Sequence, residues 1–167
     1  MSSPIISGLL FSFAKNRDYG ARLVHDLNES NMTAQPAADP DAPSNHPAWV
    51  LSHLNAYLPV IQAIIADAEF DDPKNHPFGM LSKPQTDPSI YASKDELLNE
   101  FLSRHDEIAG QLSSMSDDIF ARPIRLPRWK DVMPTAGIAL PYLMCNHENI
   151  HLGQVSAWRR IQGMPSV

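Results

Sequence analysis

Apolar residues recur at intervals of three and four along four segments of the 167-residue chain. This spacing places side chains on one face of a helix. The segments run from about Pro4 to Leu27, from about Asn45 to Ala68, from Ser93 to Ser114 and from about Thr135 to Gln162. No segment shows the strict alternation that marks a half-buried strand. The pattern predicts an all-α fold, a four-helix bundle with long connecting loops.

Residues with special backbone preferences mark the ends of these helices. Ser93 and Glu96 form a capping box at the start of the third helix. Asn45 is the candidate N-cap of the second helix, and Gly163 follows the last turn of the fourth. Pro59 lies inside the second helix, where it removes one backbone hydrogen bond, so we expect a kink there.

Three connecting segments that each contain several prolines separate the helices: 28–45, which is also rich in asparagine and aspartate, 69–92 and 120–134. Connections as long as 69–92 are uncommon in compact domains and are often lids or binding loops, and both later segments are candidates to cover a pocket. With 43% hydrophobic residues, the chain can bury a sizeable core. Residues 1–167 are therefore expected to form one domain.

The net charge of the chain limits the kinds of partner to expect. A net charge of −6 argues against a phosphate-binding surface, and the short basic stretch 122–130 is expected to be a solvated or pocket-edge loop. Cys145 is the single cysteine, which fits a reducing cytoplasm. Neither a signal peptide nor a stretch approaching the roughly 20 apolar residues of a membrane span is evident. We expect a cytoplasmic protein with no nucleic-acid or membrane partner.

His147 and His151 stand four residues apart on the fourth helix, so their side chains lie one above the other. The residues expected on the same face are mostly apolar: Leu140, Leu143, Met144, Gln154, Val155 and Trp158. Buried polar groups without partners are costly, and a shared divalent metal is one reason to bury two imidazoles together. Cys145 is expected on the opposite face, as a buried filler.

His53 lies in the apolar stripe of the second helix. The other members of that stripe are Trp49, Val50, Tyr57, Val60 and Ile64. A lone inward histidine is commonly a satisfied core residue. Together with His147 and His151, however, it makes a three-nitrogen face that leaves a coordination position open, as in catalytic zinc sites.

Two further residues are candidates for catalysis. Tyr57, one turn from His53, can donate a proton near the metal, or it can be a core tyrosine with a hydrogen-bonded hydroxyl. Gln154, one turn beyond His151, can orient a metal-bound water or hydrogen-bond a neighbouring helix.

The other titratable residues considered are not assigned a role in metal binding or catalysis. His46 is expected at a helix end on the surface, and His105 in the core. Glu148 lies about 100° away from the ligand face and is not assigned as a base. His25 and His76 have no supporting context.

The motif Trp49-x3-His53-Leu54 and the later motif His147-x3-His151-x-Gly153-Gln154 resemble those of the DinB-like superfamily. The resemblance covers nearly the whole chain. It implies a four-helix bundle with a three-histidine metal site at His53, His147 and His151. Some members are transferases or isomerases that use low-molecular-weight thiols, others have no assigned activity, and relatives are often dimers.

Three neutral imidazoles leave the charge of a divalent metal uncompensated, which lowers the pKa of a bound water or thiol. We therefore predict a metal-dependent enzyme with zinc, nickel or iron, most simply a thiol S-transferase or isomerase acting on a small electrophile. A low-molecular-weight thiol is the expected cosubstrate. A metal-dependent hydrolase and a non-catalytic metal-binding module remain alternatives. The apolar first helix suggests a homodimer.

Overall fold

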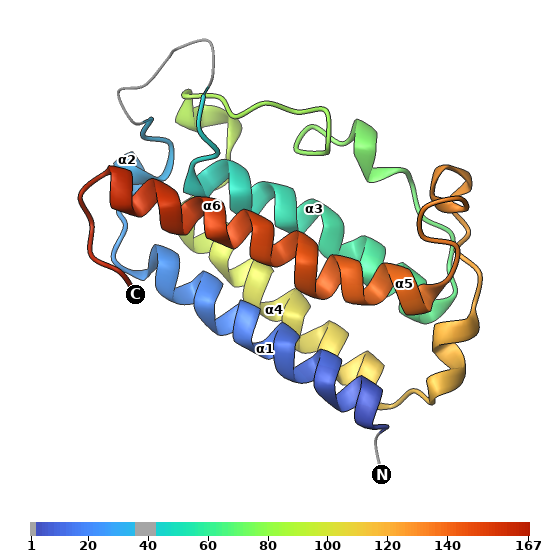
Figure 1. Ribbon diagram of the computed structural model, residues 1–167. Helices are drawn as coiled ribbons and strands as arrows, with labels where there is room; N and C mark the ends of the chain where they lie inside the picture. The colour runs from blue at the N-terminus through green and yellow to red at the C-terminus, as the bar shows by residue number, and fades with distance from the viewer. Residues whose placement is uncertain (1–2, 36–42) are drawn as a thin grey trace.

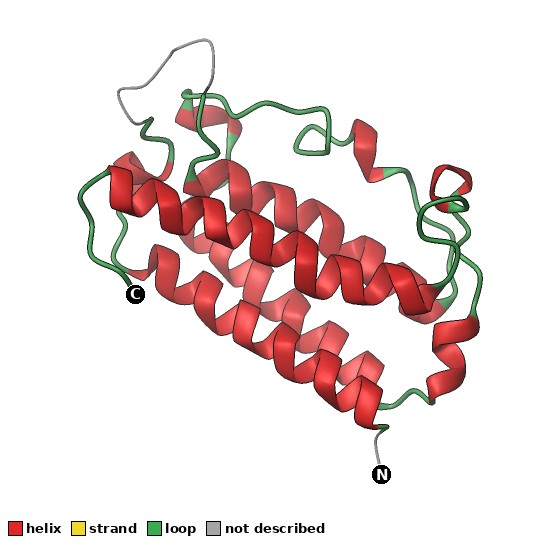
Figure 2. Ribbon diagram, in the orientation of Figure 1, coloured by secondary structure: helices red, strands yellow, loops and turns green. Residues whose placement is uncertain are grey.

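A computed structural model describes residues 3–35 and 43–167 and shows a bundle of four long helical columns (Figure 1). The columns are α1 (Pro4–His25), α3 (Pro47–Ala66), α4 (Lys94–Ser113) and a C-terminal column. That last column consists of α5 (Ala136–Pro141), the π-helical segment η5 (Tyr142–His147) and α6 (Glu148–Ile161). No strand occurs in the described ranges (Figure 2), where Pro123 and Thr135 form an isolated bridge. The predicted all-α bundle is confirmed.

The columns follow an up-down-down-up arrangement, in which α3 and α4 run in the same direction (Figure 1). The connection between them therefore returns along the length of the bundle. We call residues 67–93 the crossover loop; it contains the short 3-10 helices η1 (Pro73–Asn75) and η2 (Pro88–Ile90). Residues 114–135, here the end loop, contain η3 (Asp117–Ala121) and η4 (Pro127–Trp129) and lie at one end of the bundle.

The helix-end signals are mostly confirmed. Ser93 Oγ accepts from the Glu96 amide, and the Glu96 carboxylate accepts from the Ser93 amide, as the capping box predicts. Gly163 ends the fourth column with φ of 73°. Asn45 is not the N-cap of α3: His46 occupies that position, and its Nδ1 accepts from the Trp49 amide at 3.2 Å. An imidazole nitrogen thus accepts the capping hydrogen bond that an asparagine side chain was expected to accept.

Two elements depart from the regular pattern. The short helix α2 (Glu29–Met32) interrupts the loop expected between the first two long helices, and Asn28 caps it. The fourth column is not a uniform α-helix, because η5 follows Pro141 with π-type hydrogen bonding. Proline has no N–H, so the helix must relax locally. π segments are frequent at functional sites, and this one ends at His147.

The core is built around α3, which is buried on nearly every face. By length and mean hydropathy (1.3), α3 is apolar enough to span a membrane, contrary to the sequence-based expectation. However, 78% of its most apolar window is buried inside the protein, as in the central helix of a bundle. Pro59 lies within this continuous helix, between the buried residues Leu58 and Val60.

Candidate metal centre

Three histidines from three elements meet between α3 and the fourth column. His53 comes from α3, His147 ends η5 and His151 lies one turn along α6. One ligand nitrogen from each ring lies within 4.8 Å of the others, and the Nε2 atoms of His53 and His147 are 3.0 Å apart. Ligands of one tetrahedral zinc ion would have nitrogens about 3.3 Å apart. The structure therefore brings the three predicted residues together as a candidate metal site.

The outer nitrogens of two imidazoles are held by oxygen acceptors. His53 Nδ1 donates to the Phe78 carbonyl at 2.6 Å, and His151 Nδ1 donates to Gln154 Oε1 at 2.8 Å. Because these oxygens only accept, each Nδ1 carries the proton and each Nε2 keeps its lone pair. Trp49 stacks on His53, with centroids 4.8 Å apart and 16° between the planes. The rings are thus oriented with their free nitrogens toward the centre of the cluster.

The cluster is neutral at physiological pH. Burial lowers the pKa of His53 to about 4 and that of His147 to about 3, and in both cases the neighbouring His151 lowers the pKa further. Burial also lowers the pKa of His151, against the opposing hydrogen bond to Gln154. Metal ligation needs unprotonated imidazole, so the environment already favours the binding form. The residues present fit a divalent metal.

Glu148 follows His147 directly but belongs to a different environment. Its Oε1 lies 3.0 Å from His105 Nε2, and its Oε2 accepts from Asn16 Nδ2 at 3.2 Å. His105 Nδ1 donates to the Phe101 carbonyl at 2.7 Å. The expectation that Glu148 points away from the ligand face is confirmed, as is the core position of His105. Burial of the Glu148 carboxyl raises its pKa, an effect that His105 opposes.

A cavity of about 590 Å³ opens beside the three histidines. Trp49 and Tyr57 of α3 line one wall, and Trp129 and Met133 of the end loop line another. Several apolar residues of its lining are at least partly exposed: Met80, Val132, Ile138, Tyr142 and Ile150. Both long loops contribute to this lining, as their length predicts. The metal centre therefore faces a mostly apolar pocket of small-molecule size.

The sequence of residues 12–155 matches the DinB superfamily. The chain belongs to the DinB superfamily. Comparisons with curated proteins and with solved structures found no significant match. The family match spans His53, His147 and His151, so the cluster lies within the matched part of this DinB-superfamily protein.

The two predicted catalytic residues occupy different places. Tyr57 lines the cavity with its ring centroid 4.6 Å from that of His147, and burial raises the pKa of its hydroxyl. Gln154 lies behind His151, where its Oε1 also accepts from Asn45 Nδ2 at 2.9 Å. Gln154 thus contacts the outer nitrogen of the ligand, while Tyr57 faces the space where a substrate can sit.

The remaining candidates are explained by packing. His46 is fully buried, so the expected surface position is wrong; its Nε2 lies 2.8 Å from the Gln85 carbonyl and ties the crossover loop to α3. Cys145 is half-buried outside the cluster, and burial raises the pKa of its thiol. His25 is exposed on the last turn of α1.

One arginine of the cavity was not singled out by sequence reasoning. Arg128 donates from Nε and Nη2 to the two Asp72 oxygens, each at 2.7 Å. This bidentate pair fastens the end loop to the crossover loop across the cavity rim. Neither residue has a local motif; the basic stretch 122–130 was the available signal, and its expected pocket-edge position is confirmed for Arg128.

Proposed function

We propose that this DinB-superfamily protein is a cytoplasmic metal-dependent enzyme, a thiol S-transferase or isomerase acting on a small electrophile. The observation that carries the proposal is a neutral three-histidine face that forms part of the wall of an apolar cavity. A structural zinc site is usually closed by four protein ligands, whereas a three-ligand site leaves room for a reactant.

His53, His147 and His151 would hold zinc, nickel or iron as neutral donors. When bound, such a metal lowers the pKa of a coordinated thiol and supplies a thiolate at neutral pH. The protein orients two of the ligands through the Phe78 carbonyl and the Gln154 amide. The apolar lining excludes water and favours an electrophile of low polarity.

Tyr57 is the proton donor best placed for this chemistry. As in any tyrosine, the hydroxyl is protonated at neutral pH and can give a proton to a developing anion in the cavity. Burial raises its pKa, so the proton goes only to a strongly basic anion. Its ring contacts both His53 and His147, with centroids 4.8 and 4.6 Å away. Packing therefore fixes the ring beside the ligand face, while the hydroxyl interacts with the Met80 backbone.

A metal-dependent hydrolase is the alternative reaction for the same centre. Among the described residues that line the cavity, none is aspartate or glutamate. Hydrolytic metal sites commonly rely on such a carboxylate as general base, so its absence from this lining favours thiol transfer over hydrolysis. A metal-binding module without turnover would use the same three histidines, so only an activity assay distinguishes it from an enzyme.

The test is a panel of low-molecular-weight thiols with small electrophiles, assayed with metal-loaded protein. We expect metal-dependent consumption of a thiol that the His53→Ala variant loses. Tyr57→Phe should lower kcat by about 10²-fold or more, the usual contribution of a positioned acid. Tyr19→Phe, which is remote from the cavity, is the matched control. Cleavage of esters or amides without any thiol turnover would replace this proposal with the hydrolase.

We also infer a homodimer. Ile5 and Phe11 on α1 are 59% and 65% exposed, and paired α1 faces would cover them. Light scattering should give twice the chain mass of 18.6 kDa. A monomer mass would remove the dimer and leave the metal chemistry unaffected.

A further inference from the structure

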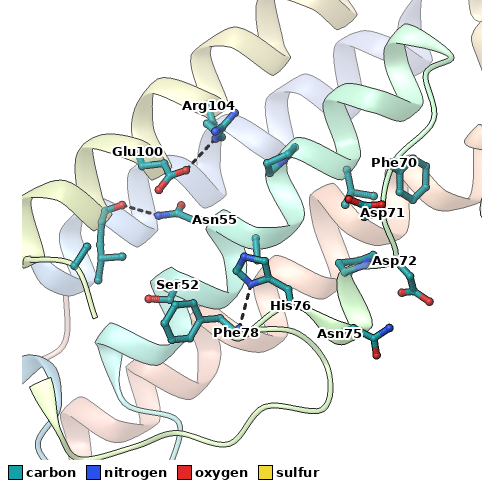
Figure 3. A pocket seen from close by; sticks show the side chains of 16 residues that line it. Ser52, Asn55, Phe70, Asp71, Asp72, Asn75, His76, Phe78, Glu100 and Arg104 are labelled. Atoms are coloured by element: carbon teal, nitrogen blue, oxygen red, sulfur yellow. Dashed lines mark hydrogen bonds and ion pairs between the residues drawn. The ribbon is translucent and has the colours of Figure 1, made fainter. Parts of the chain in front are cut away.

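A second cavity lies on another face of α3, between α3, α4 and the crossover loop (Figure 3). Its volume of about 720 Å³ exceeds that of the cavity at the metal centre. In Figure 3, Asn55 lies beside Glu100 and Arg104 of α4, and Ser52 lies beside Phe78 and His76 of the loop. None of the three metal ligands lines this space, so the metal chemistry does not account for it.

Two buried oxygens in its wall have no hydrogen-bond partner. The Ser52 and Asn55 residues are only 4% and 5% exposed, and Ser52 Oγ and Asn55 Oδ1 are both unpaired. Asn55 Nδ2 is occupied, because it donates to the Leu97 carbonyl at 3.0 Å. Buried polar atoms in native proteins are nearly always paired, so each unpaired oxygen indicates a missing partner. For Asn55 Oδ1 that partner must be a donor.

The helix backbone adds an acceptor at the same place. Pro59 lines the cavity and has no N–H, so the Asn55 carbonyl lacks the donor that residue 59 would otherwise supply. On one turn of α3, Asn55 therefore has an unpaired side-chain oxygen and a main-chain oxygen without its usual α-helical donor. Together they favour a ligand that carries several N–H groups.

The charges of the lining favour a cation. The lining contains three carboxylates, those of Asp71, Asp72 and Glu100, and one guanidinium, that of Arg104. Arg128 engages Asp72 from outside this lining, and Glu100 accepts from Arg104 Nε at 3.2 Å. No ion pair of Asp71 is found among the described residues. Acceptors therefore outnumber donors, with a net negative lining.

We propose that this second cavity binds a primary alkylamine in its protonated form. The ammonium donates to Asn55 Oδ1 on the side of the cavity where Glu100 lies, and the carboxylate of Asp71, beside Phe70 on the other side, adds to the negative charge of the lining (Figure 3). The alkyl chain packs against the apolar part of the lining, which includes Val60, Phe70 and Phe78. This site goes beyond the proposed function, because it needs neither metal nor thiol.

The experiment is a calorimetric titration of the full chain with n-butylamine at neutral pH, where the amine is protonated. Butan-1-ol and butanoate serve as neutral and anionic probes of the same length. We expect one saturable amine site, with the alcohol and the carboxylate at least about tenfold weaker. Equal binding of the alcohol, or no saturable binding of the amine, overturns the proposal.

Matched variants locate the site. Glu100→Gln should weaken amine binding about tenfold and Asp71→Asn a few-fold, whereas Glu107→Gln, an equal charge change on α4 outside the lining, should leave it within about twofold. Ser52→Ala, the substitution least demanding on the fold, should weaken binding a few-fold. Thermal melts check that each variant is folded. Equal affinities of the Glu100→Gln and Glu107→Gln variants contradict the site.

The titration is repeated after chelator treatment, because an amine can also ligate a metal. Unchanged binding supports the second cavity. Binding that disappears with the metal would place the amine at the three histidines and overturn the proposal. Loss of the thiol activity alone would leave the amine site standing, so the two proposals fail separately.

Discussion

Two buried histidine environments lie on different sides of the fourth column and use the successive residues His147 and Glu148. On one side His147 joins His53 and His151 around shared nitrogens beside a cavity. On the other side Glu148 contacts His105, whose ring stacks on Phe13 and lies against Phe101, each centroid 4.1 Å away. His53 and His105 are about equally hidden from water, at 3% and 1% exposed, whereas His147 and His151 are half-buried at the cavity wall.

The difference lies in the partners. Both nitrogens of His105 lie against oxygens of the protein: Nδ1 donates to the Phe101 carbonyl, and Nε2 lies 3.0 Å from Glu148 Oε1, a close contact without hydrogen-bond geometry. His53 and His151 each use one nitrogen and turn the other toward the shared centre. Burial therefore does not distinguish a metal-binding histidine from a structural one. A metal-binding histidine is recognised by an unused nitrogen lone pair that points, with those of its neighbours, toward one shared centre.

The largest effect expected on stability comes from Glu148→Ala. This change removes the carboxylate that contacts His105 and accepts from Asn16 Nδ2, which keeps only its bond to the Met144 carbonyl, and it leaves a cavity in the core. The free energy of unfolding should therefore fall by about 3–5 kcal/mol. Urea denaturation measures it. The double variant His105→Phe with Glu148→Leu should recover most of the loss, because an apolar pair needs no partner. A loss below about 1 kcal/mol in the single variant would mean that the network is not structural.

Gln154→Ala tests the three-histidine environment. Without its amide oxygen, His151 loses the acceptor that fixes its tautomer and orientation. Metal affinity should fall about 10- to 100-fold, as measured by competition with a chromophoric chelator. Gln111→Ala, an exposed glutamine of α4, is the control. Unchanged affinity in Gln154→Ala would show that His151 is oriented by packing alone.

The smallest effect is a pH dependence of the metal-free protein. The His147 pKa is about 3 in the folded state, against 6.5 for an unperturbed histidine. Between these values the unfolded chain binds a proton that the folded chain does not, so acidification is destabilising there, by at most about 1.4 kcal/mol per pH unit. Above pH 6.5 the contribution vanishes.

His147→Gln removes this contribution. The stability difference between the variant and the wild type should therefore shift toward the variant as the pH falls from about 6 to 4. Chemical denaturation at several pH values, with chelator present, measures the shift. A constant difference would mean that His147 is not held neutral in the folded state.

Helical periodicity predicted the all-α bundle and the inward positions of His53, His147 and His151, and the resemblance to the DinB-like superfamily grouped the three as one site. The spacing of His147 and His151 survives the π segment because both residues lie at or beyond its end. The inward position of His53 follows from the apolar stripe of α3. These are local properties, which a helix converts directly into geometry.

Features made by distant partners were not accessible in the same way. Glu148 is buried because Asn16, 132 positions away, and His105 supply its contacts. Arg128 and Asp72 are separated by 56 positions, and nothing in either local sequence indicates the pairing. The helix start at His46 depends on an imidazole that replaces the usual cap. The second cavity likewise needs the fold before its unpaired oxygens can be recognised.

The most direct test of the central claim is the metal content and coordination of protein purified without an affinity tag. Elemental analysis should find about one divalent metal per chain, and X-ray absorption should show about three imidazole nitrogens near 2.0–2.1 Å for zinc. The His151→Ala variant should lose stoichiometric binding while the His25→Ala variant keeps it. A metal retained unchanged in His151→Ala, or no uptake by the wild type, would contradict the three-histidine centre.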